Sequence, residues 1–386
     1  MYYNEERKLF HNNKQKVEIK NINLKGPHII KIIIFILFIY LIIFLFIEDN
    51  FLANIKNKIF FENKNNSYNI ISRLKNLRPF KEDRKEINNK KQIYISMSLD
   101  NNLVYPTLVS MTSALENNNS TRNILVYYLL LSNDFNVSNV KIFESLKMKY
   151  QVKINYYIIP KIFNNLRRWT NGTECVYYKL ILPILFDNLT RIIYLDGDTL
   201  IYQDISEMYE LDFNDNYILG YPFNCPQVLD KFGIRVINYI NGGVLLFNLD
   251  KIKRDNKIND LLECTIQYNE KLEYLEQDSI NLIFHPKIGL LPLKYGMYLF
   301  GNITIFDKFI KNRLRFKINK NEIIDSLKNP SILHFSGCYP KIWNYVTLSG
   351  YFIDEICKTI QKDFYYYANK TNYYLNIYNL YMKISK

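Results

Sequence analysis

The chain has 386 residues and a formal net charge of +13, from 50 Lys and Arg against 37 Asp and Glu. This length allows one large α/β domain with accessory segments. The basic residues are scattered and no nucleic-acid recognition motif accompanies them, so we expect no nucleic-acid partner. The five cysteines are widely spaced, without a Cys-x-x-Cys pair, and so predict neither a zinc site nor a dense disulfide framework.

An apolar run near the amino terminus predicts a membrane anchor. Residues 29–47, interrupted only by Lys31, are about long enough to cross a bilayer as a helix. Basic residues precede the run, and Glu48 and Asp49 follow it, which leaves residues 1–28 as a cytoplasmic tail. A cleaved signal peptide is the alternative, but the polar leader is long and no small-residue cleavage site follows. We therefore expect a single-pass type II membrane protein with the bulk of the chain in the lumen of the Golgi or endoplasmic reticulum.

The segment after the anchor differs from the rest of the chain. Residues 48–91 are polar and charged without clear periodicity, which indicates a stem.

After this segment, predicted strands and helices alternate along the chain. Apolar patterns predict strands at 93–97, 124–131, 153–159 and 192–195, and helices at 106–116, 137–149, 176–186 and 261–268. Such alternation predicts a parallel sheet with helices on both faces and a ligand at the carboxyl ends of the strands.

Two carboxylates directly follow the strand at 192–195. Asp196 and Asp198 are separated only by Gly197, which lets the backbone turn closely. At the end of a buried strand, two acids at this spacing can reach one hard divalent cation. Asp100 and Asn102 leave the first strand at the same edge of the sheet, so both polar exits could face one crevice.

Three later motifs each have a plain structural alternative. Asn241-Gly242-Gly243 predicts a turn before a buried strand, or a place where the backbone approaches a ligand. Glu276-Gln277-Asp278 precedes a helix at 279–284, where acids commonly serve only to cap. His334 lies in a strand at 332–337, and a single histidine there is more often structural than a ligand.

The last segment, residues 346–386, is rich in Tyr, Ile and Leu with interspersed Lys. It predicts a helical extension that packs on the domain or lies on a membrane surface, and we favour packing.

In order and spacing these motifs resemble those of glycosyltransferase family 8, which contains retaining enzymes that use sugar nucleotides. The motifs are Asp100-Asn101-Asn102, Tyr178-Lys179, Leu195-Asp196-Gly197-Asp198-Thr199, Asn241-Gly242-Gly243-Val244, Glu276-Gln277-Asp278-Ser279-Ile280-Asn281 and His334-Phe335-Ser336-Gly337. The resemblance implies an α/β GT-A fold, a Rossmann-like mixed, mostly parallel sheet flanked by helices, over residues 92–345. It also implies an enzyme that moves glucose, galactose or xylose from a UDP-sugar to a glycoprotein, glycolipid or other glycan acceptor.

The resemblance further implies roles for single residues. Asp196 and Asp198, with His334, would coordinate Mn²⁺ (or Mg²⁺) that bridges the donor diphosphate. Asp100 and Asn102 would contact uridine, and Gly337 and Lys341 would hold the diphosphate. The donor sugar would be fixed by Lys179, Asn241, Glu276 and Gln277, and Gly242 would belong to the same donor-binding site.

Gln277 would lie beneath the anomeric carbon of the donor. A covalent intermediate would need a carboxylate nucleophile, for which Glu276 and Asp278 are the candidates. We favour same-face attack assisted by the departing phosphate, because the residue implied at that carbon is an amide.

Three positions depart from the family pattern. Leu103 stands where an aromatic residue is usual, Lys179 stands where some relatives have arginine, and the closing motif from Gly337 to Trp343 is one residue longer.

Three other functions remain as alternatives. A haloacid-dehalogenase-like phosphatase is disfavoured, because Leu200 occupies the position where that class needs Thr or Val. A catalytically inactive, membrane-anchored binding protein and a glycogenin-like self-glucosylating enzyme are the other two.

Overall fold

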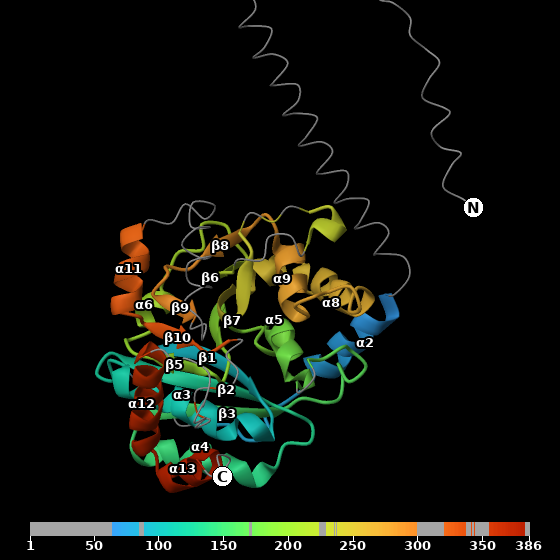
Figure 1. The fold of residues 1–386 in the computed structure, drawn as a ribbon. Coiled ribbons are helices and arrows are strands. Elements are labelled where there is room, and N and C mark those ends of the chain that lie inside the picture. The colour runs from blue at the N-terminus through green and yellow to red at the C-terminus, as the bar shows by residue number, and fades with distance from the viewer. Residues whose placement is uncertain are drawn as a thin grey trace, which may run out of the picture. The chain divides into compact units, whose positions relative to one another are not determined.

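A computed structural model describes residues 64–84, 89–169, 172–223, 229–234, 236, 238–298, 320–336, 341, 343 and 355–382. They belong to one compact unit, shown as the coloured ribbon in Figure 1. The expected cytoplasmic tail at 1–28, the expected anchor at 29–47 and residues 48–63 of the expected stem lie outside these ranges. Within the described ranges, no helix is both long and apolar enough to cross a membrane.

The larger sheet has seven strands in the order β3-β2-β1-β4-β7-β6-β8. They are β1 (Lys91–Leu99), β2 (Asn123–Leu131), β3 (Val152–Ile158), β4 (Arg191–Leu195), β6 (Ile218–Pro222), β7 (Ile240–Asn248) and β8 (Ile288–Leu290). Strands β3, β2, β1 and β4 are parallel neighbours, β7 runs antiparallel to β4 and β6, and β6 is parallel to β8. The sheet is therefore mixed and mostly parallel, as expected.

Helices cover both faces of this sheet. Alternate side chains of each buried strand point to opposite faces, and on each face they form a core with a different set of helices. On β4, Ile193 and Leu195 enter the first core, and Ile192 and Tyr194 enter the second. The first core includes α3 (Val104–Asn117) and α4 (Val140–Glu144). The second includes α2 (Lys64–Lys75), the 3-10 helix η4 (Glu174–Ile181), α5 (Leu182–Leu185), α7 (Leu249–Arg254), α8 (Lys257–Gln267) and α9 (Glu276–Phe284). The remaining short helical turns are η1 (Asn101–Leu103), η2 (Val137–Asn139), η3 (Ser145–Met148), α6 (Ser206–Tyr209) and η5 (Asp230–Phe232).

A smaller sheet is attached to the carboxyl end of β4. It has the order β5-β10-β9, with β5 at Thr199–Ile201, β10 at Ile332–His334 and β9 at Tyr295–Tyr298. Strand β10 is antiparallel to β5, and this register places His334 opposite Thr199. The smaller sheet therefore places His334, which is distant in the sequence, beside Thr199, the residue that follows Asp198.

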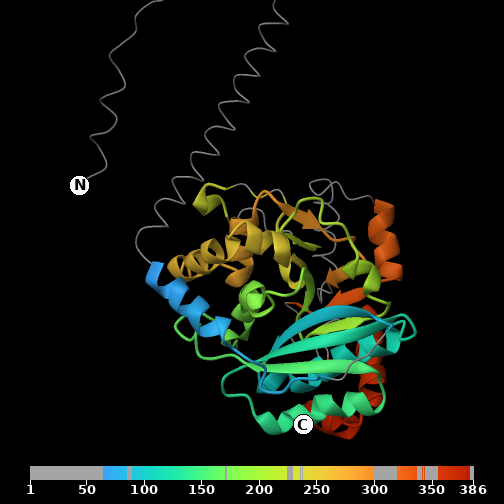
Figure 2. The same ribbon diagram turned by 180° about the vertical axis from the view of Figure 1, so that it is seen from behind.

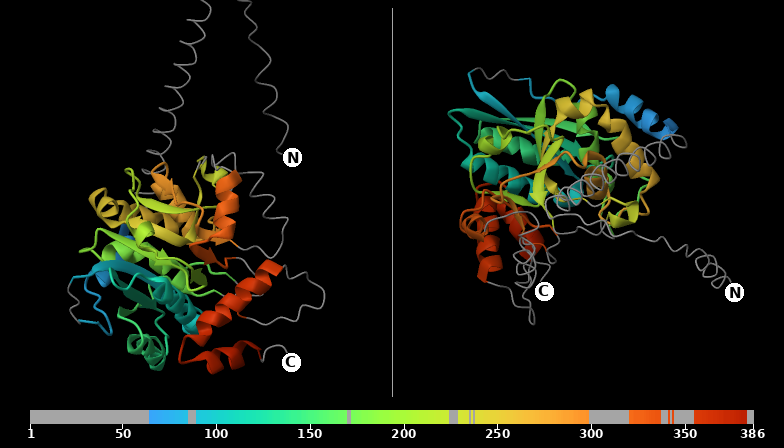
Figure 3. Two further views of the ribbon diagram at one scale, coloured as in Figure 1. Left: turned by 90° about the vertical axis from the view of Figure 1, so that its left-hand side faces the viewer. Right: turned by 90° about the horizontal axis from the view of Figure 1, so that it is seen from above.

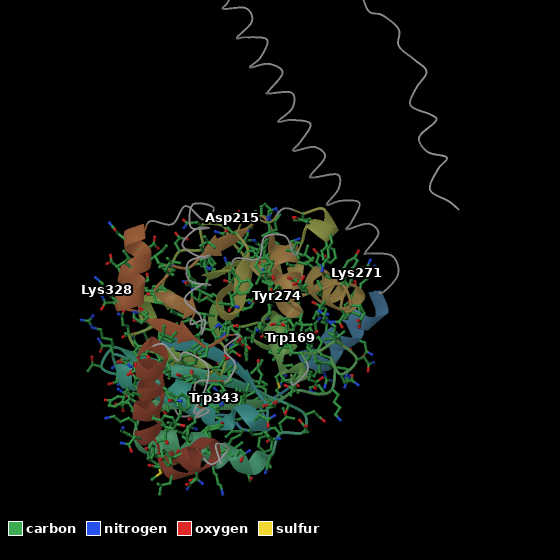
Figure 4. The ribbon with its side chains drawn as sticks, in the orientation of Figure 1. Trp169, Asp215, Lys271, Tyr274, Lys328 and Trp343 are labelled. Carbon is green, nitrogen blue, oxygen red and sulfur yellow. The ribbon has the colours of Figure 1, made fainter. Side chains whose placement is uncertain are left out.

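The carboxyl-terminal helices pack on this second sheet. Helices α11 (Lys320–Lys328), α12 (Glu355–Asn369) and α13 (Tyr374–Met382) share a third core with β5 and β10. Trp343, labelled in Figure 4, lies in this core with its ring centroid 5.9 Å from that of Phe364. Figure 3 shows α12 and α13, in red, on one side of the described domain. In its described part, the carboxyl-terminal extension thus packs on the domain, which is the alternative that we favoured.

Part of the segment that we interpreted as a stem is folded. Helix α2 buries Ile70 and Leu74 in the second core, and Ser67 Oγ donates to Glu263 Oε1 of α8 at 3.0 Å. Figures 1 and 2 both show α2, in blue, beside α8. Further along, the amide of Tyr156 in β3 donates to the carbonyl of Lys81 at 2.9 Å. The stem interpretation is therefore wrong for residues 64–84, which pack on the domain instead.

Candidate active site

Three candidate metal ligands meet where β4 leads into β5. One ligand atom each from Asp196, Asp198 and His334 lies within 4.8 Å of the others. His334 Nε2 is 3.5 Å from Asp196 Oδ2 and 3.2 Å from Asp198 Oδ1. Two carboxylates and an imidazole form a donor set that suits a divalent ion such as Mn²⁺. The residues present therefore fit the metal that the sequence implied.

Gly243 makes this arrangement possible. A Cβ atom at this position would lie 2.1 Å from His334 Cε1 and 2.5 Å from Asp196 Oδ2. The Gly243 carbonyl also accepts a hydrogen bond from the amide of Asp196 at 2.8 Å. Gly242 and Gly243 both lie inside β7, so the turn expected before this strand is wrong. Close approach of the metal ligands, rather than a turn, explains a glycine here.

Close approach also explains Gly197. Its Cβ would lie 2.4 Å from Thr107 Oγ1 in α3. Among the described glycines, only Gly233 and Gly296 have positive φ angles, so Gly197 needs no left-handed backbone. Helix α3 therefore packs directly against the residue that separates the two aspartates.

The charges around the cluster favour its ionised form. Burial alone would raise the pKa of Asp196, but Lys179 and then His334 outweigh burial and lower it. Burial likewise opposes ionisation of Asp198, whose pKa Lys341 and His334 lower. Burial would lower the pKa of His334, but Asp198 and Asp196 raise it to about 9. In the metal-free protein both aspartates are therefore ionised at neutral pH and His334 is protonated, so an incoming cation must displace a proton.

A buried ion pair lies next to the cluster. Lys179, from η4, is only 2% exposed. Its Nζ donates to the carbonyl of Gly242 at 2.8 Å and to Glu276 Oε1 at 2.9 Å, and it lies 3.5 Å from Asp196 Oδ1. The fold therefore brings together Lys179, Glu276 and Gly242, all of which we expected at the donor site.

Gln277 is held by three hydrogen bonds. Its Oε1 accepts from Asn241 Nδ2 at 3.0 Å and from the amide of Gly242 at 2.8 Å. Its Nε2 donates to the Tyr239 hydroxyl at 3.1 Å. The side-chain amide thus has a fixed orientation beside β7.

Asp278 has a different environment from Glu276. Its Oδ1 accepts from the Tyr239 hydroxyl at 2.5 Å, and its Oδ2 accepts from the amides of Glu273 at 2.6 Å and Tyr274 at 2.9 Å. The side chain is fully buried. These contacts fix the backbone of Glu273 and Tyr274, just before the N-cap residue Leu275 of α9, and they do not suit Asp278 to the nucleophile role considered above.

The turn after β1 lies against the aspartate pair. Asp100 Oδ1 accepts from the amides of Asn102 at 2.9 Å and Leu103 at 3.1 Å, and so caps η1. Leu103 Cβ is 3.9 Å from where a Cβ of Gly197 would lie. The two polar strand exits therefore meet at one edge of the sheet, as expected, with Asn102 exposed there.

Lys341 reaches the cluster although the closing motif is one residue longer than usual. Its Nζ donates to Asp198 Oδ2 at 2.5 Å and to the carbonyl of Phe335 at 3.0 Å. Gly337, expected to contact the diphosphate, lies outside the described residues.

Sequence reasoning missed Tyr194, whose hydroxyl donates to Asp196 Oδ1 at 2.9 Å. We counted this residue only as part of a buried strand. Its position two residues before Asp196 was the available signal, because residues i and i+2 of a strand lie on the same face.

With this geometry established, comparison with known proteins identifies the family. The model of glycosyl transferase family 8 matches residues 94–347, more than half of the chain. The chain belongs to glycosyltransferase family 8. It is 28% identical over 232 residues to a lipopolysaccharide 1,2-glucosyltransferase of Escherichia coli, a match that covers 57% of this chain and 65% of that protein. It is 23% identical over 227 residues to a glycosyltransferase homologue of Haemophilus influenzae, covering 55% of this chain and 62% of that one. The chain thus spans less than two thirds of the length of both relatives.

Solved structures of similar fold include two glycosyltransferases. The galactosyltransferase LgtC, in complex with donor and acceptor sugar analogues, has a TM-score of 0.57 and 17% identity, covering 73% of this chain and 96% of LgtC. The bifunctional glycosyltransferase WbbM has a TM-score of 0.61 and 18% identity, covering 78% of this chain and 53% of WbbM. At these identities the likeness concerns the fold, and it confirms the expected GT-A-like α/β architecture.

Proposed function

We propose that this family 8 chain is a metal-dependent retaining glycosyltransferase that moves a hexose or pentose from a UDP-sugar to a glycoprotein, glycolipid or glycan acceptor. The observation that carries the proposal is the cluster of Asp196, Asp198 and His334. A cation held there offsets the negative charge that develops on a nucleoside diphosphate leaving group.

The surrounding residues would support the same step. Lys341, in contact with Asp198, supplies a second positive charge where the diphosphate would bind. Gln277 is oriented by its three hydrogen bonds and presents an amide, which is not a nucleophile. Glu276 is already paired with Lys179. These contacts favour same-face attack assisted by the departing phosphate over a covalent intermediate.

UDP release tests the proposal. The full-length chain, purified in detergent, would be incubated with UDP-glucose, UDP-galactose and UDP-xylose, with Mn²⁺ or with EDTA. We expect Mn²⁺-dependent UDP release with at least one donor, and a rate at least about 100-fold lower for Asp198→Asn. The exposed carboxylate of Asp212 provides the control, and Asp212→Asn should retain activity. If UDP is released from none of the three donors, the result contradicts the proposal.

We also propose that residues 29–47 anchor the protein, with residues 1–28 in the cytoplasm and the catalytic domain in the lumen of the Golgi or endoplasmic reticulum. The apolar run and its basic amino-terminal flank support this proposal. Resistance to alkaline extraction, with protection of the domain from protease added outside sealed vesicles, is the expected result. Release of the protein by alkaline carbonate would contradict the anchor.

A further inference from the structure

The two carboxylate oxygens of Asp196 lie in different environments. Oδ1 accepts from the Tyr194 hydroxyl at 2.9 Å and is 3.5 Å from Lys179 Nζ. Oδ2 is 3.5 Å from His334 Nε2 and lies against Gly243, where the missing side chain leaves space. The first oxygen thus faces protein donors, and the second faces the other metal ligands.

We propose that Tyr194 and Lys179 are positioning residues that hold Oδ1 of Asp196 inside the protein, so that Asp196 offers only Oδ2 to a divalent cation. This inference rests on the proposed metal-dependent function. It assigns a task to Tyr194, and it gives Lys179 a role that acts through Asp196 and Glu276.

Tyr194 is built into the sheet in a way that suits this task. It is 1% exposed and lies in β4, two residues before Asp196, which its hydroxyl contacts. Most buried tyrosine hydroxyls have a hydrogen-bond partner, and for Tyr194 this partner is Asp196 Oδ1. The tyrosine ring also lies under the lysine, with Lys179 Nζ 4.7 Å from the ring centroid. Tyr194 therefore contacts both partners of the pair.

Lys179 is surrounded by protein oxygens. An ammonium group has three N–H bonds, and Nζ has three oxygen neighbours, at 2.8 Å (Gly242 carbonyl), 2.9 Å (Glu276 Oε1) and 3.5 Å (Asp196 Oδ1). The side chain is 2% exposed. Its donors are therefore directed to the protein, which fixes the two carboxylates relative to each other.

A carboxylate restricted to one oxygen has a consequence for metal choice. Calcium sites commonly use both oxygens of a carboxylate and many ligands, whereas Mg²⁺ uses few protein oxygens at short distances. We therefore expect the site to prefer Mn²⁺ or Mg²⁺ to Ca²⁺, and we expect this preference to depend on Tyr194.

The test compares two Tyr→Phe variants of the full-length protein. Tyr194→Phe removes the hydroxyl that contacts Asp196. Tyr127→Phe is the matched control, because Tyr127 is fully buried on strand β2 of the same sheet and its hydroxyl has no hydrogen-bond partner among the described residues. Mn²⁺ affinity would be measured by electron paramagnetic resonance of the free ion, in the presence of saturating UDP, with Ca²⁺ as a competitor. We expect Tyr194→Phe to weaken Mn²⁺ binding by about tenfold and to narrow the preference for Mn²⁺ over Ca²⁺, whereas Tyr127→Phe changes neither.

Each other outcome rejects the inference. Unchanged Mn²⁺ affinity in Tyr194→Phe would overturn it and leave the metal site intact. Equal weakening of Mn²⁺ and Ca²⁺ would also overturn it, because general loosening of the site would have that effect. If the wild-type protein binds no Mn²⁺ with UDP present, both this inference and the proposed metal-dependent function are wrong.

Discussion

Gly243 offers a sharp test of the cluster at the level of a single residue. A methyl group at this position would overlap His334 and Asp196. In Gly243→Ala one of these ligands must move, and we expect Mn²⁺ affinity to fall by at least about 100-fold. The adjacent Gly242 provides the control, since its Cβ would meet its nearest neighbours at an ordinary 3.4 Å. Gly242→Ala should keep both the fold and Mn²⁺ binding. Similar Mn²⁺ affinity in the two variants would contradict the cluster.

His334 predicts how metal binding responds to pH. Its pKa is raised from 6.5 to about 9 by Asp198 and Asp196, against the effect of burial. Protonated His334 therefore contributes stability to the metal-free protein. This contribution is fully present below pH 6.5 and is lost as the pH rises through about 9. Because a metal needs the neutral imidazole, Mn²⁺ affinity should rise by up to about tenfold per pH unit between 7 and 9.

Calorimetry in buffers of different ionisation enthalpy checks this expectation. We expect release of about one proton for each Mn²⁺ bound at pH 7.5. Binding without proton release, with an affinity that does not change between pH 7 and 9, would show that His334 is not a ligand.

Some site residues could be predicted from the sequence and others could not. Asp196, Asp198 and His334 stand in motifs whose order is informative, so their convergence was predicted. The role of Tyr194 depends on neighbours that only the folded chain supplies, and its residue type does not suggest that role. Gly243 is an intermediate case, because the glycine pair predicted a close approach as one alternative but did not show that His334 and Asp196 are the groups that approach. For Asp278 the sequence suggested a role that the structure does not support. An acid beside Gln277 was a candidate nucleophile, but its Oδ2 accepts hydrogen bonds from two backbone amides.

At the scale of elements, α2 can be tested as part of the domain. Leu74 is 1% exposed in the second core. Its truncation in Leu74→Ala should lower the free energy of unfolding by about 2 to 4 kcal/mol, because a buried cavity is left. Arg73→Ala, at an exposed neighbouring position, should change it by less than about 0.5 kcal/mol. Urea denaturation would measure both, and equal stability of the two variants would show that α2 contributes nothing to the fold.

The elements also show where sequence patterns succeed. The central strands were predicted because continuous apolar runs such as Ile192 to Leu195 are typical of strands buried on both faces. Helix α2 was missed because its apolar residues are dispersed among Asn, Ser and Lys, and packing against α8 rather than its own pattern reveals it. The expected helix at 176–186 is mostly the 3-10 helix η4, which then leads into α5.

At the scale of the whole domain, the candidate metal joins two sheets. Asp196 follows β4 of the larger sheet, whereas His334 ends β10 of the smaller one. An ion bound by both stabilises only the folded state, by about 2.7 kcal/mol at a concentration 100 times its dissociation constant. We expect Mn²⁺ to raise the thermal midpoint of the wild-type protein and to have little effect on His334→Ala. An equal shift in both proteins would contradict a metal that bridges the sheets.

Because the two sheets are separated along the chain, their strands are synthesised at different times. The seven strands of the larger sheet and both aspartates are complete once Leu290 has left the ribosome. The histidine is made more than forty residues later, and β10 cannot pair with β5 before then. A nascent chain can therefore assemble most of its framework while it still lacks a metal-binding group. The capacity to hold the cation, and with it the proposed activity, would be acquired only after His334 has been added and β10 has paired with β5.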